Sequence, residues 1–293
     1  MKWIDYAKPD SLEGAVKLLG ESGGKARPFA GGTDLLVLMR VNPARIGSPD
    51  LVVDIKGLPE LNELSYDDDT GLTIGAAVEC YKIYSDKLVK EKYPAIIDSS
   101  SLIGGIQIQG RASIGGNLCN AAPSADSIPS LIALGATANL LGSSGTRQVA
   151  VEDFCKGPGK TVLSDDEVLV SISLPAPKQN QGSRYIRFIP RNEMDIAVAG
   201  VGVSVVVEDG TFQEAKIALS SVAPIPLYVK EAGESLIGKT VNDENISVAA
   251  GIAKSTASPI TDMRGTAEYR KHLCEVLTRR AINTAIERAN GGK

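Results

Sequence analysis

The chain has 293 residues, of which 43% are hydrophobic and 23% charged, a composition typical of a globular protein of roughly two domains. The formal net charge of −4 at pH 7 creates no overall positive field, so nucleic acid is not expected as a partner. The longest apolar runs, Leu131–Leu141 and Ile196–Val207, are shorter than the roughly 18 to 20 residues that cross a bilayer, and residues 1–6 contain no apolar signal core. We therefore expect a cytoplasmic protein without a membrane span.

The cysteines and the single histidine limit the chemistry that the chain can perform. Cys80, Cys119, Cys155 and Cys274 include no CxxC pair, so neither a zinc knuckle nor an iron–sulfur cluster has its usual ligand spacing. Because His272 is the only imidazole, a multi-histidine metal site is excluded and a Ser-His-Asp triad would have to use that residue. We predict reduced thiols and no metal site.

Residues 1–57 predict a small α/β unit. A strand at 3–6 precedes a helix that has Asp10 or Ser11 as its N-cap and ends at the glycine pair 23–24. The elements that follow are a strand at 27–30, a glycine turn at 31–32, an apolar run at 35–39 and a strand at 51–55.

The spacing of turn residues within 61–175 is typical of β-hairpins. Turn residues at 67–71 and 142–145 lie between short β-prone runs and indicate an antiparallel sheet. Helical patterns at 81–100 and 126–134 interrupt it, so the expected class is α+β.

The remainder of the chain predicts a separate domain. Residues 175–183 contain two prolines and no large apolar side chain, which favours a linker. The elements expected after it are strands at 185–188, 200–207 and 212–219, a hairpin turn at 208–211, and helices of which the last covers 266–290.

Two segments resemble a nucleotide-phosphate loop but do not match it. Residues 156–161 and 20–25 each lack the first glycine of GxxxxGK[ST], where Phe154 and Leu19 stand instead. No GxGxxG lies between a strand and a helix either. We therefore reject an ATP site and a Rossmann site.

A first glycine loop lies between a predicted strand and a predicted helix. Paired glycines at this position let backbone N–H groups approach an anion, and the helix dipole favours it. The alternative is a plain turn in which Thr33 or Asp34 caps the helix, and the charge of Asp34 suits a cap better than a phosphate contact. The loop consists of Pro28, Phe29, Ala30, Gly31, Gly32, Thr33, Asp34 and Leu35.

A second loop, residues 111–126, contains small residues and amides and almost no bulky side chain. Such a stretch cannot build a core, but it lets a ligand lie against the backbone. Ser113, Asn117, Asn120 and Asp126 could then donate or accept hydrogen bonds, although Asp126 could instead cap the next helix. Together, the two loops suggest a clamp on a cofactor that contains a diphosphate.

At these residues the chain resembles the FAD-binding medium subunits of molybdenum hydroxylases, such as bacterial carbon monoxide, nicotinate and xanthine dehydrogenases. The resemblance rests on AGGTDL at 30–35 and ASIGGNLCNAAPSAD at 112–126, with further similarity at 166–175 and 191–197. It implies the α+β, two-subdomain FAD-binding fold of the vanillyl-alcohol oxidase (PCMH) type. The implied units are subdomain 1 at 1–57, subdomain 2 at 58–177, and a C-terminal flavoprotein domain of the carbon monoxide dehydrogenase type at 178–293, with a three-stranded antiparallel sheet and helices.

The resemblance also implies roles for individual residues. The first loop would surround the diphosphate, Leu169 would pack near the cofactor, Arg187 would place a basic group near the flavin, and Ile196 would cover one face of the isoalloxazine. Asn120 and Asp126 would reach polar parts of the cofactor. The residues that would continue the diphosphate site are Ile103, Gly104, Ser113, Ile114, Gly115, Gly116 and Asn117. No catalytic residue is expected, because the flavin carries the redox chemistry.

The implied function is electron transfer. Noncovalent FAD would accept electrons one at a time from iron–sulfur clusters of a small partner subunit and pass them to an external acceptor, while a large subunit would hold the molybdopterin. Iron–sulfur clusters and molybdopterin are thus expected on partners only, in a dimer of heterotrimers. Covalent attachment would require His272, which the pattern places in the C-terminal helix. The alternatives are a stand-alone FAD-dependent oxidoreductase of the same fold and a cofactor-free scaffold subunit.

The loops also lead to an expectation about substitutions. Valine at Gly32 or Gly116 should abolish flavin binding and leave the chain folded, because a β-carbon and its methyls would occupy the space of the cofactor. If the glycines only relieve strained turns, the same substitutions should lower stability instead.

Overall fold

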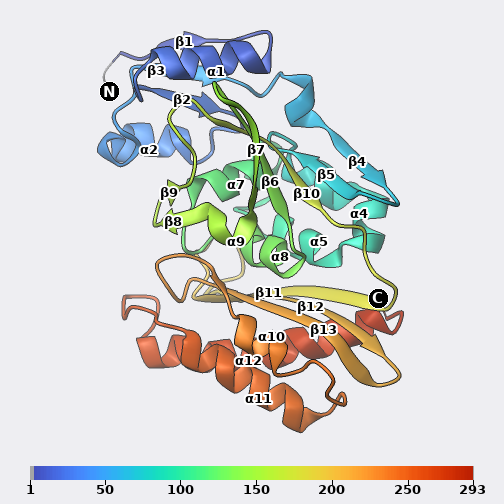
Figure 1. The fold of residues 1–293 in the computed structure, drawn as a ribbon. Coiled ribbons are helices and arrows are strands. Elements are labelled where there is room, and N and C mark those ends of the chain that lie inside the picture. The colour runs from blue at the N-terminus through green and yellow to red at the C-terminus, as the bar shows by residue number, and fades with distance from the viewer. Residues whose placement is uncertain (1–2, 293) are drawn as a thin grey trace.

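Three larger sheets, one above another in Figure 1, organise the computed structural model, which describes residues 3–292. The first is parallel, in the order β1-β3-β2. Its strands and the adjoining helices are β1 (Asp5–Ala7), α1 (Leu12–Glu21), β2 (Ala26–Phe29), α2 (Leu35–Val41), the 3-10 helix η1 (Pro43–Ile46) and β3 (Leu51–Asp54). The Oγ of Ser11 accepts a hydrogen bond from the backbone N of Gly14 at 3.0 Å. Ser11, and not Asp10, is therefore the N-cap, and the predicted α/β unit is confirmed.

The second sheet is antiparallel throughout, in the order β4-β5-β10-β6-β7. Both predicted hairpins are present, as β4–β5 and β6–β7. The strands are β4 (Leu64–Asp67), β5 (Gly71–Gly75), β6 (Thr137–Gly142), β7 (Gly145–Ala150) and β10 (Val168–Leu174), with a separate small hairpin of β8 (Cys155–Gly157) and β9 (Lys160–Thr161). The helical segments are η2 (Pro59–Asn62), α3 (Cys80–Ser85), α4 (Lys87–Lys92), α5 (Pro94–Ser100), α6 (Ile106–Gln109), α7 (Ile114–Asn120), α8 (Ser127–Ala133) and α9 (Val151–Phe154).

The helical pattern predicted at 81–100 is confirmed, and the segment folds as three short helices, α3, α4 and α5. Asp86 ends α3, and its Oδ1 accepts a hydrogen bond from the N of Val89 at 2.9 Å, which caps α4. Pro94 then occupies the first turn of α5, a position that needs no N–H donor.

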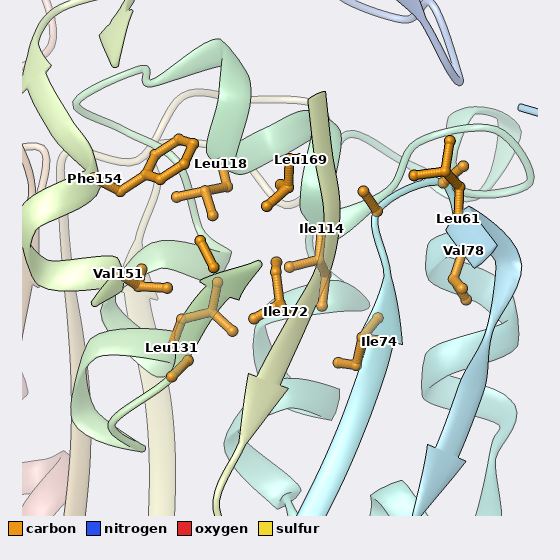
Figure 2. Close-up of a cluster of buried hydrophobic side chains, with 14 of the residues drawn as sticks. Leu61, Ile74, Val78, Ile114, Leu118, Leu131, Val151, Phe154, Leu169 and Ile172 are labelled. Atoms are coloured by element: carbon orange, nitrogen blue, oxygen red, sulfur yellow. The ribbon is translucent and has the colours of Figure 1, made fainter. Parts of the chain in front are cut away.

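The core of this region lies between the second sheet and its helices. Figure 2 shows Ile114 of α7 between Ile172 of β10 and Ile74 of β5, with Leu131 of α8 nearby. Ile74, Ile114 and Ile172 are fully buried. Burial of each such side chain contributes about 1.5 to 3 kcal/mol, so α7 is held firmly against the sheet, with Ile114 as its anchor.

The third sheet belongs to the C-terminal part, in the order β11-β12-β13-β14. Its elements are β11 (Gln181–Phe188), β12 (Ala199–Glu208), β13 (Thr211–Ser220), β14 (Leu227–Tyr228), α10 (Lys230–Glu234), α11 (Asp243–Thr256) and α12 (Ala267–Ala289). The prediction of three strands omitted β14, whose two residues pair with Ala218 and Leu219. The predicted linker is also too long, because residues 181–183 pair with β12 as the start of β11.

The C-terminal sheet packs on the second region through α5 and α8 (Figure 1). At Gly202 of β12 an added β-carbon would overlap the carbonyl of Pro129 in α8, so glycine permits this close approach. Beside it, the carboxylate of Asp98 accepts hydrogen bonds from Arg184 Nη1 and Arg288 Nη1, each at 2.7 Å, and from the N of Tyr185 at 3.1 Å. We call Asp98, Arg184 and Arg288 the interdomain ion cluster.

Two searches of residues 3–292 limit the functional possibilities. None of their helices combines the length and apolar character required of a transmembrane span. Nor do they contain a group of three or more His, Cys, Asp or Glu side chains arranged to hold a metal ion.

Candidate flavin-nucleotide site

A cavity of about 540 Å³ lies between the first and second sheets, within the size range of small-molecule and cofactor sites. Its walls come from the β2–α2 turn, η1, the start of α7, the β8–β9 hairpin and the segment that leads into β10. Segments far apart in the sequence thus converge on one space.

The first glycine loop forms one wall at a point where the two loops touch. An added β-carbon at Gly31 would overlap the carbonyl oxygen of Arg111, and Arg111 Nε donates a hydrogen bond to the carbonyl of Gly31 at 3.1 Å. Gly32 has a φ of +75°, and its β-carbon would overlap the ring of Phe29. Glycine is therefore needed at both positions for the loop itself to form.

The expectation for Gly32→Val must be corrected. Because the residue adopts a left-handed conformation above the Phe29 ring, valine there would strain the loop whether or not a cofactor binds. Loss of flavin binding in that variant would include a loss of stability.

The second glycine loop forms the opposite wall. Ser113 Oγ accepts a hydrogen bond from the N of Gly116 at 3.0 Å and so caps α7. A β-carbon at Gly115 would overlap Ala76, whereas one at Gly116 would meet only Ser113 Oγ, at 3.1 Å. Asn117 Oδ1 accepts hydrogen bonds from Ser127 N and Oγ at 3.2 and 2.6 Å, which fixes the loop to α8.

This arrangement fits a nucleotide cofactor that contains a diphosphate. The glycines leave backbone close to the cavity without side chains in between, Arg27, Arg45 and Lys160 add positive charge, and Leu169 provides an apolar surface. Backbone and cationic groups of this kind bind phosphate oxygens.

The cavity brings together most of the predicted site residues. Those that line it are Pro28, Ala30, Gly31, Gly32, Thr33, Asp34, Leu35, Ile103, Ser113, Gly115, Gly116, Asn117, Asn120 and Leu169. Those that do not are Phe29, Gly104, Ile114, Asp126, Arg187 and Ile196.

Four of these exceptions have a local explanation. The ring of Phe29 lies under Gly32 and carries Lys56 Nζ at 4.8 Å from its centre, and Ile114 is buried in the core (Figure 2). Gly104 has a φ of +62° and packs against Ile108. Ile196 is 47% exposed on the loop between β11 and β12.

The other two exceptions form a buried ion pair between the second region and the C-terminal sheet. Arg187 Nη1 donates to Asp126 Oδ2 at 2.6 Å, and the hydroxyl of Tyr185 donates to Asp126 Oδ1 at 2.7 Å. Asp126 precedes α8 without a side-chain capping bond, so the capping alternative is wrong. Burial raises the pKa of Asp126 to about 6, although Arg187 and Tyr185 oppose that shift.

Sequence reasoning missed the β8–β9 hairpin. Gly159, Lys160 and Thr161 line the cavity, although in the sequence their segment resembles only an incomplete nucleotide-phosphate loop. Its glycine and lysine were the available signal, but nothing local indicated where the hairpin would fold. Cys119, for which the sequence predicts only a reduced thiol, also lines the cavity. Burial raises the pKa of its thiol to about 12, which makes it unreactive. All four cysteines are free.

Glu167 leads to a prediction about acid stability. The hydrogen bonds that Arg147 donates to this carboxylate, at 2.6 and 2.7 Å, hold its pKa below 4.5. A lowered folded-state pKa contributes stability that is present above the unfolded value of 4.5 and is lost as the pH falls through the folded value. In denaturant titrations, the stability advantage of wild type over Glu167→Gln should therefore be constant above about pH 5.5 and shrink below pH 4.5. An advantage that grows in acid would contradict the assignment.

Comparisons with known proteins agree with this geometry. Residues 2–177 match the family model described as the FAD binding domain in molybdopterin dehydrogenase, and residues 184–285 match the CO dehydrogenase flavoprotein C-terminal domain. The chain is 33% identical to the carbon monoxide dehydrogenase medium chain of Afipia carboxidovorans, over 98% of each chain. It is 30% identical to the xanthine dehydrogenase FAD-binding subunit of Escherichia coli O157:H7, over 99% of this chain and 98% of the relative.

Solved structures give the same result. A carbon monoxide dehydrogenase chain from Hydrogenophaga pseudoflava superimposes with a TM-score of 0.93 at 32% identity, over 98% of each chain. Quinoline 2-oxidoreductase of Pseudomonas putida 86 gives 0.89 at 28% identity, over 99% of each chain.

Fold and site thus define a two-subdomain flavin-nucleotide-binding protein. The chain belongs to the family of FAD-binding medium subunits of molybdenum hydroxylases. It is an oxidoreductase flavoprotein subunit that acts in electron transfer, and the predicted fold class and function are confirmed. The domain boundaries at 57 and 177 and the roles of individual site residues stay predictions.

Proposed function

We propose that the chain holds one noncovalent FAD in the cavity between its first two sheets and relays electrons from iron–sulfur clusters of a partner subunit to an external acceptor. The observation that carries the proposal is the contact of two glycine loops at Gly31 and Arg111 beside the cavity. When bound, FAD supplies reversible one- and two-electron chemistry.

The residues of the chain bind and orient the cofactor. Backbone groups of Gly31, Gly32 and Gly116 would approach the diphosphate, and Asn117 holds the second loop in place through Ser127. Leu169 and Ile103 would exclude water from the apolar part of the cavity. His272 is exposed on α12 and does not line the cavity, which supports noncovalent binding. Asp126 and Arg187 would hold the C-terminal sheet beside the site.

The partners follow from the family. Its members include chains named as medium chains and subunits of dehydrogenase complexes, which supports a small iron–sulfur subunit and a large molybdopterin subunit as partners of this chain. We extend the proposal to a dimer of heterotrimers in the cytoplasm. The molybdenum and iron–sulfur cofactors would lie on the partners.

The test begins with the purified chain saturated with FAD. Acid precipitation should release about one FAD per chain. Dithionite should bleach the flavin absorbance of the isolated chain, whereas aldehydes, N-heterocycles and carbon monoxide should leave it unchanged. Adding the iron–sulfur and molybdenum subunits should restore bleaching by one of these substrates.

Other outcomes separate the alternatives. Turnover of a substrate by the isolated chain at about 1 to 1000 per second would favour a stand-alone oxidoreductase. A chain that takes up no flavin would be a scaffold. Flavin that remains on the precipitated protein would contradict noncovalent binding.

A further inference from the structure

Two exposed cationic side chains line the cavity from different parts of the fold. Arg45 belongs to η1, and Lys160 belongs to the β8–β9 hairpin; both line the cavity and both are exposed. Residues that line a cavity and also contact solvent lie at its mouth. Figure 1 shows α2, which η1 follows directly, on the same side of the molecule as this hairpin.

Gly159 lets η1 and the β8–β9 hairpin come into contact. It has a φ of +71°, and a β-carbon added there would lie 3.3 Å from Arg45 Nε. The Arg45 side chain therefore passes directly over the tip of the hairpin. Because the residue before Lys160 has no side chain, nothing separates the guanidinium from the hairpin backbone.

The hairpin tip is fixed to the second glycine loop. The N of Gly159 donates a hydrogen bond to the carbonyl of Ala121 at 3.0 Å, and Ala121 ends α7 in a left-handed conformation with a φ of 45°. Lys160 is thus held on the same structural unit as Ser113, Gly116 and Asn117, and does not lie on an independent surface loop.

The charges of this pair are only partly balanced. Within residues 3–292, neither Arg45 nor Lys160 has a carboxylate within 4.0 Å. Of the acids that line the cavity, Glu167 is already paired with Arg147, and Asp165 lies beside Gly24. Asp34 interacts with Arg45 at longer range. No lining acid is paired directly with Lys160.

We propose that Arg45 and Lys160 form a cationic clasp that closes over the mouth of the cavity and binds the diphosphate of FAD. The inference rests on the proposed function, because it assigns further residues to the same cofactor. The two phosphates are the anionic groups of oxidised FAD at neutral pH, so they are the chemistry that two otherwise unpaired cations would recognise.

The test measures FAD affinity by flavin fluorescence for wild type, Arg45→Gln, Lys160→Gln and the double variant. We expect each single substitution to weaken binding about five-fold, the upper range for one exposed ion pair, and the double substitution about 25-fold. Raising the salt concentration from 0.05 to 0.5 M should weaken FAD binding to wild type, because salt screens exposed charges. The affinity of the double variant should depend much less on salt.

Matched controls come from neighbouring cations. Arg40→Gln on α2 and Lys156→Gln on β8 remove exposed charges that do not line the cavity, and both should keep wild-type affinity. Equal affinities for wild type and the double variant would overturn the clasp, as would a double variant that binds weakly but keeps the full salt dependence. Failure of wild type itself to bind FAD would instead refute the proposed function.

Discussion

Replacing Gly116 by valine is expected to abolish FAD binding while the chain stays folded. An added β-carbon would meet only Ser113 Oγ, at 3.1 Å, so the two γ-methyls would extend into the cavity that Gly116 lines. FAD affinity should fall by more than about 100-fold, since backbone approach to the diphosphate is blocked. Crowding of the Ser113 cap would cost no more than about 2 kcal/mol.

Two measurements separate this effect from misfolding. Flavin titration reports the affinity, and circular dichroism melts report the stability. Gly110→Val is the matched control, because Gly110 lies shortly before the loop, its φ is −74°, and an added β-carbon would meet nothing within 4 Å. Unchanged FAD affinity in Gly116→Val would contradict the position given to the second loop.

Substituting Asp98 by alanine should strongly lower the stability of the protein. It leaves Arg184 and Arg288 of the interdomain ion cluster without their carboxylate. Removing one partner of a buried ion pair costs about 3 to 5 kcal/mol, and we expect the lower end because the Arg184 side chain is 32% exposed. Urea titration should therefore show a loss of about 3 kcal/mol in the free energy of unfolding.

Glu234→Ala is the control for that experiment. Glu234 pairs with Lys230 at 3.7 Å, and both side chains are more than half exposed, so its loss should cost less than about 0.5 kcal/mol. FAD affinity should be retained in Asp98→Ala, since Asp98 does not line the cavity. A stability change no larger than that of the control would show that the cluster does not hold the domains together.

The parts of the site that sequence alone could predict are those built from neighbouring residues. The first loop was recognisable because a strand, two glycines and a helix follow one another over residues 28–35. The hairpins at 67–71 and 142–145 were recognisable for the same reason, since turn residues determine them locally.

What could not be predicted depends on contacts between distant residues. Asp126 could be interpreted as a cap or a ligand, yet it pairs with Arg187, 61 positions later. Arg45 belongs to no motif in the sequence, and only the folded chain brings it against Gly159. Ile114 follows Ser113 directly but is buried in the core, because successive positions of α7 face different sides.

The order in which the chain is synthesised determines when the interdomain ion cluster can form. All residues that line the cavity fall between Ala26 and Leu169, whereas the cluster is completed by Arg288, 119 positions after Leu169. Domains fold as units, the N-terminal ones first, while the ribosome is still translating. The cofactor cavity can therefore form on a nascent chain before Arg288 has been synthesised, and the C-terminal domain closes against a cavity that already exists.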